Sequence, residues 1–221
     1  MPAEVFSTAT THPSPEAIDR AAEVISSGGI ALFPTDTVYT VASLAVAGRR
    51  ISGGVARLRN FKRRGFGPSF PWLVTSAADL DVYGMDVSDD ARRLAQAFWP
   101  GGLSIVVHAS SAVPRSLAHR NGSIALRLSA SPVVSAIISL VDRPLVSTGA
   151  NEHGAPPPTA FSDIVPEVLD AVDVALDGGD AEGAGHSTVV DCTGTQPRIL
   201  REGVVSRAEV DEALGYRTPL V

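Results

Sequence analysis

The chain has 221 residues, of which 44% are hydrophobic and 19% are charged, so it is long and apolar enough to fold around a full core. A formal net charge of −6 excludes a molecule that binds polyanions over its whole surface. No apolar run approaches the ~20 residues of a membrane span, and the N-terminus lacks the basic and apolar segments of a signal peptide. We therefore expect a cytoplasmic protein that makes no membrane contact.

The first half of the chain is expected to mix helices and strands after a polar arm. Residues 1–14 are rich in proline, threonine and serine, which predicts a flexible N-terminal arm. Ser14 followed by Pro15 is typical of a helix start, and the apolar spacing that follows predicts a helix that ends at Gly28. Beyond it we expect strand 30–33, strand 39–47, helix 51–60, loop 61–71, strand 72–74, helix 89–98 and strand 103–109.

The second half continues in the same mixed way, with a loop over residues 149–158 that contains three consecutive prolines. We expect strands at 123–128, 145–147, 172–176, 187–192 and 198–201, and helices at 132–140, 161–169 and 206–214. Helices and strands do not follow a strict βαβ rhythm, which favours an α/β domain with a mixed twisted sheet. No repeat or linker is visible, so we expect one domain over residues 15–214 and a short tail over 215–221.

The stretch from Phe33 to Tyr39 places two hydroxyls, a carboxylate and a phenol directly after an apolar run. Pro34 ends the predicted strand because it has no N–H to donate. Thr35 and Thr37 lie two residues apart, so in an extended segment both hydroxyls face the same side and can bind a phosphate or a carboxylate. An ordinary Pro-Thr-Asp turn explains the same residues, and they do not by themselves decide between the two interpretations.

Basic residues are concentrated in one short segment of this acidic chain. Seven of the 18 basic residues fall there: Arg49, Arg50, Arg57, Arg59, Lys62, Arg63 and Arg64. A solvated helix face accounts for most of them, but an anionic ligand is the alternative. Lys62 stands apart because it is the only lysine in the chain, and a lysine ammonium is a compact point charge suited to a phosphate oxygen.

Several familiar sites are missing from the sequence. It has no Gly-x-x-x-x-Gly-Lys-Ser/Thr loop, no Gly-x-Gly-x-x-Gly after a strand, and no spacing of acidic residues and histidines that is typical of a metal site. The single cysteine, Cys192, excludes an internal disulfide and is expected to be a small buried residue. Surface or loop positions are expected for all five histidines: His12, His108, His119, His153 and His186.

Seven short motifs follow one another along the chain: Pro34-Thr35-Asp36-Thr37-Val38-Tyr39, Lys62-x-Arg64, Trp99-Pro100-Gly101, Ser123-x-x-x-Arg127, Ala150-Asn151, His186-Ser187-Thr188-Val189-Val190-Asp191 and Leu200-Arg201-x-Gly203-x-x-Ser206. In order and spacing they resemble the YrdC/TsaC family, the threonylcarbamoyl-AMP synthases, in its short form without an extra C-terminal domain. The resemblance covers roughly residues 15 to 214. It implies a YrdC-like twisted mixed sheet with flanking helices and a basic concave face.

The resemblance also implies an activity of the nucleotidyltransferase type. Members of this family join L-threonine, bicarbonate and ATP into threonylcarbamoyl-AMP and release pyrophosphate. A partner complex then moves the threonylcarbamoyl group onto tRNA, so tRNA or tRNA-modifying proteins are the implied partners. ATP enters as a substrate, and Mg²⁺ is the implied metal ion, although no residue of this chain is assigned to hold it.

Residue roles follow from the same resemblance, position by position. Lys62 and Arg64 would act as the catalytic cations on the ATP phosphates. The wider ATP-binding set would be Lys62, Arg64, Ser123, Asn151, Thr159 and Arg201. The amino-acid substrate would be held by Thr35, Thr37, Arg127, Gly149 and Ser187. Within that set, Arg127 would present its planar fork to the substrate carboxylate.

Three positions depart from the family pattern: Thr40 and Gly149 replace a glycine and a serine, and Pro68 replaces a polar contact. A lost hydroxyl at Gly149 predicts an enlarged or altered amino-acid pocket. Two alternatives therefore stay open beside the threonine enzyme. One is a paralogue that makes a carbamoyl-adenylate of another amine. The other is a non-catalytic module that binds RNA or nucleotide, which the intact Lys62, Arg64, Asn151 and Arg201 set disfavours.

Overall fold

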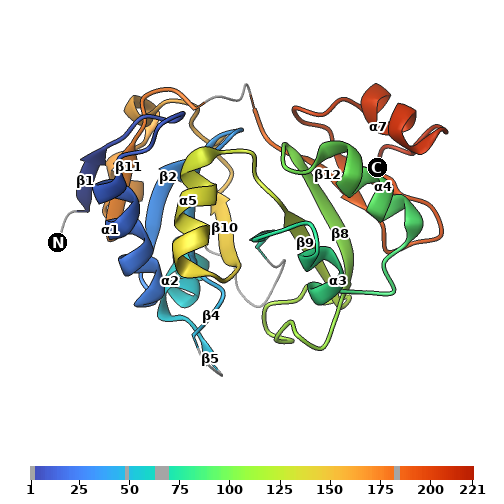
Figure 1. Cartoon of the computed structure of the whole chain (residues 1–221), viewed down its shortest axis with the longest axis horizontal. Helices are drawn as coiled ribbons and strands as arrows, with labels where there is room; N and C mark the ends of the chain where they lie inside the picture. Colours follow the sequence, from blue (N-terminus) through green and yellow to red (C-terminus); the bar gives the residue numbers. More distant parts are fainter. Residues whose placement is uncertain (1–2, 48–49, 63–69, 182–184) are drawn as a thin grey trace.

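A computed structural model describes residues 3–47, 50–62, 70–181 and 185–221. Its main feature is a mixed sheet of strands in the order β1-β11-β2-β3-β10-β6-β9-β8-β12-β13, with β7 paired to β8 (Figure 1). The strands of this sheet are β1 (Glu4–Ser7), β2 (Ala31–Pro34), β3 (Tyr39–Leu44), β6 (Trp72–Leu73), β7 (Gly84–Met85), β8 (Leu103–Ala109), β9 (Ser123–Arg127), β10 (Leu145–Gly149), β11 (Val174–Asp177), β12 (Thr188–Asp191) and β13 (Arg198–Arg201). A separate ribbon joins β4 (Val46–Ala47) to β5 (Arg50–Ile51). The expected α/β class with a mixed twisted sheet is confirmed.

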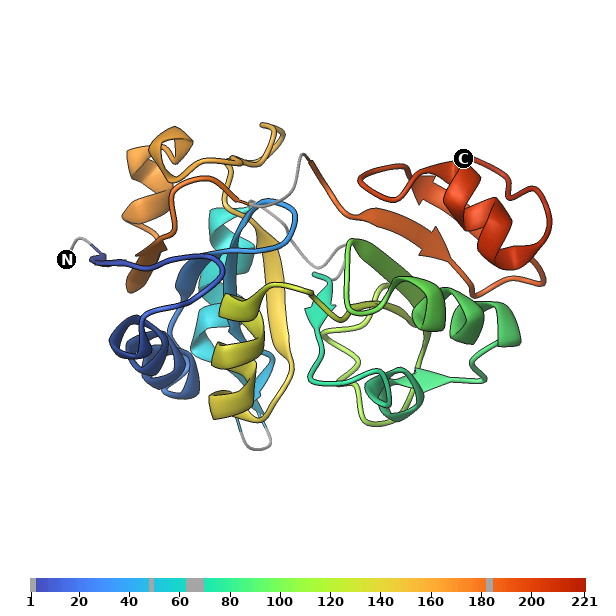
Figure 2. The ribbon, with the colours of Figure 1, turned by 45° about the horizontal axis from the view of Figure 1, so that its top comes forward.

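Helices flank the sheet along its whole width. They are α1 (Pro15–Ser26), α2 (Gly53–Phe61), α3 (Asp79–Tyr83), α4 (Asp89–Phe98), α5 (Pro132–Val141), α6 (Pro166–Leu169) and α7 (Arg207–Leu214), with a 3₁₀ turn at Phe161–Asp163. Helices α1 and α5 lie side by side over one face, where their apolar sides pack on Phe33, Leu145 and Val174 (Figures 1 and 2). At the other end of the sheet, α4 packs against β8 and α7. Among the described residues, none of the helices combines the length and the apolar character needed to cross a bilayer.

Strand β3 holds the centre of the first half of the sheet, and all six of its residues are buried. It runs antiparallel to both β2 and β10, with Pro34 opposite Tyr39. The motif residues 35–38 therefore form the tight turn between β2 and β3. The Thr35 hydroxyl fixes this turn, because it donates to Val38 O at 2.7 Å and accepts from the backbone N–H of Thr37 at 3.1 Å.

The two ends of the chain differ from the expectation of a loose arm and a tail. Residues Glu4–Ser7 form β1, an edge strand parallel to β11, so the arm is not loose there. The Arg20 side chain also donates to Glu4 at 2.8 Å. At the other end, Ile199 N donates to Pro219 O at 2.8 Å, which pairs the tail with β13. Both paired segments are too short to show an apolar pattern that would reveal the pairing.

Element boundaries shift where proline or a second pairing intervenes. The strand expected over 39–47 divides into β3 and β4, and the strand expected over 145–147 runs on to Gly149 because β3 continues beside it. The helix expected over 161–169 separates into a 3₁₀ turn and α6, which starts at Pro166. Residues 63–69 of the expected loop 61–71 lie outside the described residues.

Gly54 determines how closely α2 approaches the sheet. A Cβ built on Gly54 would overlap the Ser43 side chain and would lie 2.8 Å from Gly29 O, whereas one on Gly53 would have no neighbour nearer than 4.0 Å. We expect Gly54→Ala to lower the free energy of unfolding by about 1–3 kcal/mol through overpacking. The matched control Gly53→Ala should change it by less than about 1 kcal/mol. Urea unfolding of both variants measures the difference, and equal stabilities would contradict this packing.

Candidate active site

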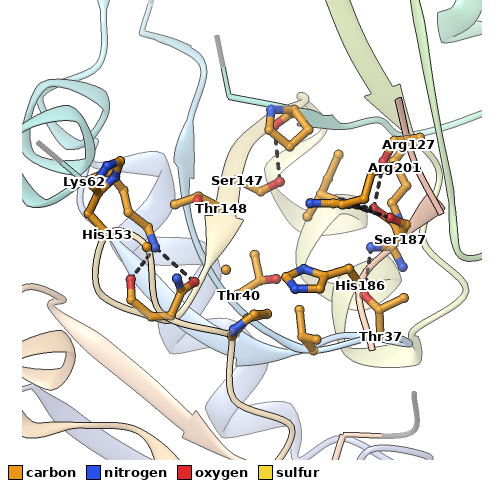
Figure 3. A pocket seen from close by; sticks show the side chains of 18 residues that line it. Thr37, Thr40, Lys62, Arg127, Ser147, Thr148, His153, His186, Ser187 and Arg201 are labelled. Carbon is orange, nitrogen blue, oxygen red and sulfur yellow. Dashed lines mark hydrogen bonds between the residues drawn. The ribbon is translucent and has the colours of Figure 1, made fainter. Parts of the chain in front are cut away.

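A cavity of about 220 Å³ opens beside the β2–β3 turn, where residues from six strands and from the loops between elements converge (Figure 3). Within the described parts of the chain, its lining consists of Thr37, Val38, Thr40, Lys62, Pro71, Leu73, Ser104, Arg127, Ser147, Thr148, Gly149, Asn151, His153, Gly154, Pro157, His186, Ser187 and Arg201. Three of these side chains are permanent cations and six carry hydroxyls. This composition suits an anionic, hydrogen-bonding ligand.

Arg127 is held at one end of the cavity by a buried ion pair. Its Nη2 lies 2.8 Å from Asp36 Oδ1, and the two side chains are only 8% and 10% exposed. The guanidinium also donates to Thr37 Oγ1 at 2.9 Å and to the Gly101 carbonyl at 3.0 Å. Desolvation lowers the pKa of Arg127 and the Asp36 charge opposes this, so the guanidinium stays charged at neutral pH. Two of its five N–H groups remain for a ligand.

Arg201 brings a second guanidinium to the same end. It lies on β13 and donates to Ser187 O at 2.9 Å, while Ser187 Oγ is 3.1 Å from Ser104 Oγ. Desolvation, and after it the charge of Arg127, lowers the pKa of Arg201. Two like charges that repel each other in a partly buried site are well suited to share an anion.

Lys62 enters from the opposite side of the cavity (Figure 3). It follows the last turn of α2 and is only 3% exposed. Its ammonium donates to the backbone carbonyl of Asn151 and, at 3.1 Å, to Asn151 Oδ1. Asn151 in turn donates to Ala155 O at 2.6 Å, which folds the proline-rich loop back beside the lysine. The only lysine of the chain is therefore fixed at the cavity wall.

Gly149, at the end of β10, lies directly against the proline-rich loop. A Cβ built on Gly149 would lie 2.6 Å from Asn151 Oδ1 and 2.9 Å from Pro157 Cβ. The neighbouring loop, not open cavity, fills the space that a larger residue would occupy. Gly149 still lines the cavity, so the expectation of an enlarged or altered amino-acid pocket at this position stays a prediction.

We expect Gly149→Ala to lower kcat/KM for the reaction proposed below by about 10- to 100-fold. The new methyl group would displace Asn151, and the contact between Asn151 and Lys62 would be lost. Gly194→Ala is the matched control, since its added Cβ would meet no atom nearer than 3.6 Å. Steady-state kinetics on both variants test this expectation. Wild-type kinetics in the Gly149 variant would show that Asn151 is not needed in this position.

The structure brings together most of the residues that the sequence singles out. Seven of them line the cavity: Thr37, Lys62, Arg127, Gly149, Asn151, Ser187 and Arg201. Thr35 is buried within the turn, and Ser123 is buried and donates to Asn121 Oδ1 at 2.7 Å. Thr159 is exposed and is not part of the lining, while Arg64 lies outside the described residues. The roles of all these residues in binding stay predictions.

Sequence reasoning missed several lining residues. Ser104, Ser147 and Thr148 come from β8 and β10, and their hydroxyls resemble those of any strand residue. His153 and His186 are exposed loop residues, as expected, and both also line the cavity. Burial, and after it the charge of Arg201, lowers the pKa of His186 below its ordinary value. The one available signal was that His186 is the first residue of the motif that contains Ser187.

The described lining does not fit a protein-held Mg²⁺ site. Mg²⁺ is usually bound through one or two carboxylates together with substrate phosphates. No aspartate or glutamate belongs to the described lining, and the described residues contain no group of three or more histidine, cysteine, aspartate or glutamate side chains able to hold a metal ion. No step of the reaction proposed below therefore uses a metal ion held by these residues.

Comparison with known proteins identifies the family. The model of the Sua5/YciO/YrdC family, which carries the description "Telomere recombination", matches residues 23–203. The chain belongs to this family. A Mycobacterium tuberculosis protein named provisionally as a threonylcarbamoyl-AMP synthase is 35% identical over 212 residues, which are 96% of this chain and 95% of that protein. A Xanthomonas euvesicatoria protein named threonylcarbamoyl-AMP synthase is 31% identical and is aligned with 84% of this chain and 97% of its own length.

A solved structure of the family gives the same fold. The crystal structure of Pyrococcus abyssi Sua5 complexed with L-threonine superposes with a TM-score of 0.89 at 27% identity and covers 98% of this chain. The present chain spans 62% of that Sua5 chain. The family assignment from the motifs is thus confirmed by both sequence and fold.

Proposed function

We propose that the protein is an L-threonylcarbamoyl-AMP synthase, which joins L-threonine, bicarbonate and ATP and releases pyrophosphate. The observation that carries the proposal is the cavity, in a chain of this family, with Arg127 and Arg201 at one end and Lys62 at the other. The names of the relatives and the threonine bound to Sua5 support threonine as the amino acid. The product would supply the threonylcarbamoyl group for tRNA modification, through tRNA-modifying partner proteins.

The amino acid is proposed to bind at the Arg127 end. The two remaining N–H groups of Arg127 pair with its carboxylate, and Thr37 and Ser187 face the same space. Asp36 keeps the guanidinium in place through the 2.8 Å ion pair. Thr35 is proposed to act from behind the lining, because its hydroxyl fixes the turn and lies 3.0 Å from Thr37 Oγ1.

ATP is proposed to bind across the cavity with its phosphates between Lys62 and Arg201. In the reaction, the nitrogen of threonine forms a bond to the carbon of carbon dioxide derived from bicarbonate, which gives a carbamate. A carbamate oxygen then attacks the α-phosphorus of ATP, and the bond to the β-phosphate oxygen breaks as pyrophosphate leaves. Fixed cations stabilise the negative charge that develops at phosphorus. This bond exchange at the α-phosphorus makes the enzyme a nucleotidyltransferase.

A second candidate substrate has a specific observation in its favour. Thr40 lines the cavity at a position where the family pattern has glycine, and Gly149 replaces a serine. Both differences lie near the proposed amino-acid site, so an amine other than threonine is the alternative substrate. Pyrophosphate release measured with threonine and with a panel of other amines tests the proposal. Release that needs threonine, bicarbonate and ATP together supports it, and release with another amine in place of threonine overturns it.

A further inference from the structure

The proposed function sets a chemical requirement that the cations of the site do not meet. At neutral pH threonine carries an ammonium group, whose nitrogen has no lone pair with which to attack carbon. A base must take one proton from it before the carbon–nitrogen bond can form. This inference therefore rests on the proposed function and asks which residue of this chain is the base.

The described lining leaves very few groups that can accept a proton. Lys62, Arg127 and Arg201 are cations, and the hydroxyl and amide side chains are too weakly basic. No carboxylate belongs to the described lining. Two imidazoles remain, those of His153 and His186, and histidine is the side chain whose neutral form is common near pH 7.

Position separates the two histidines. His186 directly precedes Ser187, and its ring points into the cavity between Thr40 and Thr37 (Figure 3). This is the end of the cavity that holds Arg127 and Arg201. His153 lies in the proline-rich loop on the Lys62 side (Figure 3). Only His186 is therefore near the proposed amino-acid site.

We propose that the neutral imidazole of His186 takes the proton from the substrate ammonium and passes it to the hydroxyl of bicarbonate. That hydroxyl leaves as water, and the carbon dioxide so formed accepts the nitrogen lone pair. The nitrogen then loses a second proton to solvent, which leaves the carbamate. One ammonium and one bicarbonate thus give one carbamate, one water and one proton, and His186 returns to its neutral form.

The surroundings of His186 favour this role. Its pKa is lowered by burial and by Arg201 on β13, so the ring is neutral at pH 7. The other charged groups that line the cavity are Arg127 on β9 and Lys62 after α2, with His153 as the remaining titratable side chain. Asp36 faces Arg127 in its ion pair. Activity should therefore fall only on the acid side, below the ordinary histidine pKa of 6.5.

The test is the pH dependence of threonylcarbamoyl-AMP formation in His186→Gln. At pH 7 we expect kcat to fall by about 100-fold, while the KM values for ATP and threonine change little. The deficit should shrink as pH rises, because the ammonium of threonine then loses its proton in solution. Added imidazole should restore part of the rate in His186→Ala.

His12→Gln is the matched control, since it removes an exposed histidine that does not line the cavity. It should keep the wild-type pH profile and at least one third of the wild-type rate. A His186→Gln variant with the wild-type rate and pH profile would overturn the inference while the proposed function stands. Failure of the wild-type protein to form the product with threonine would instead overturn the proposed function and this inference with it.

Discussion

Lys62→Ala is expected to lower the rate of threonylcarbamoyl-AMP formation by at least about 100-fold, which is the usual cost of removing one fixed charge from a transition state. Lys62 is 3% exposed and its ammonium is fixed on Asn151 at the cavity wall. No other lysine exists in the chain to take its place. Lys62→Arg should also be poor, because a planar fork does not fit a buried site shaped for an ammonium.

Arg57→Ala is the matched control for Lys62, since both residues come from the same basic segment. Arg57 lies on α2 in an exposed ion pair with Asp173 at 2.7 Å. Exposed pairs contribute at most about 1 kcal/mol, so its loss should leave the rate unchanged within about three-fold. Comparable product formation in Lys62→Ala and wild type, with both proteins folded, would show that phosphate binding does not depend on this lysine.

Arg127→Leu is expected to lower the free energy of unfolding by about 3–5 kcal/mol and to abolish threonine binding. The substitution removes the cation from the ion pair and leaves the Asp36 carboxylate buried. The Ser129 hydroxyl still donates to this carboxylate. Combining it with Asp36→Asn should recover part of the stability, because the uncompensated charge disappears. Threonine binding should not recover, since the fork for its carboxylate is still missing.

Urea unfolding of the two single variants and the double variant measures this coupling, and calorimetry with threonine measures binding. The control is Arg198→Leu, which breaks a pair with Asp191 in which the arginine is 51% exposed. Its effect should stay near 1 kcal/mol. A loss below 1 kcal/mol in Arg127→Leu, or no recovery in the double variant, would mean that the Asp36–Arg127 pair does not stabilise the fold.

Much of the fold was predictable because apolar periodicity and capping residues mark its elements. Helix α7 is capped by a capping box made by Ser206 and Glu209, and α5 is capped by Ser131, directly before Pro132. The pairing of strands was not predictable in the same way. Strand β1 joins β11, some 170 residues away, through a four-residue segment too short to show an apolar alternation. Such a pairing depends on backbone hydrogen bonds, which leave no trace in the sequence.

The candidate site was predictable where a motif contains an unusual residue. Lys62 stands out as the only lysine of the chain, Arg127 was assigned from the motif resemblance, and both line the cavity. Ser123 and Thr159 were chosen by position alone, and neither lines it. Gly149 shows the limit most clearly, since the sequence did not reveal that Asn151 and Pro157 lie where a larger side chain would stand. Which neighbour fills a space is a property of the tertiary packing.

The most direct test of the proposed function is product identity. The purified protein is mixed with ATP, Mg²⁺, L-threonine and carbon-13-labelled bicarbonate, and the products are analysed by mass spectrometry. We predict threonylcarbamoyl-AMP that carries one labelled carbon, with one pyrophosphate released for each molecule formed. A protein that binds ATP but forms no such product with threonine would contradict the account, and an adenylate formed with another amine from the same mixture would identify the alternative substrate.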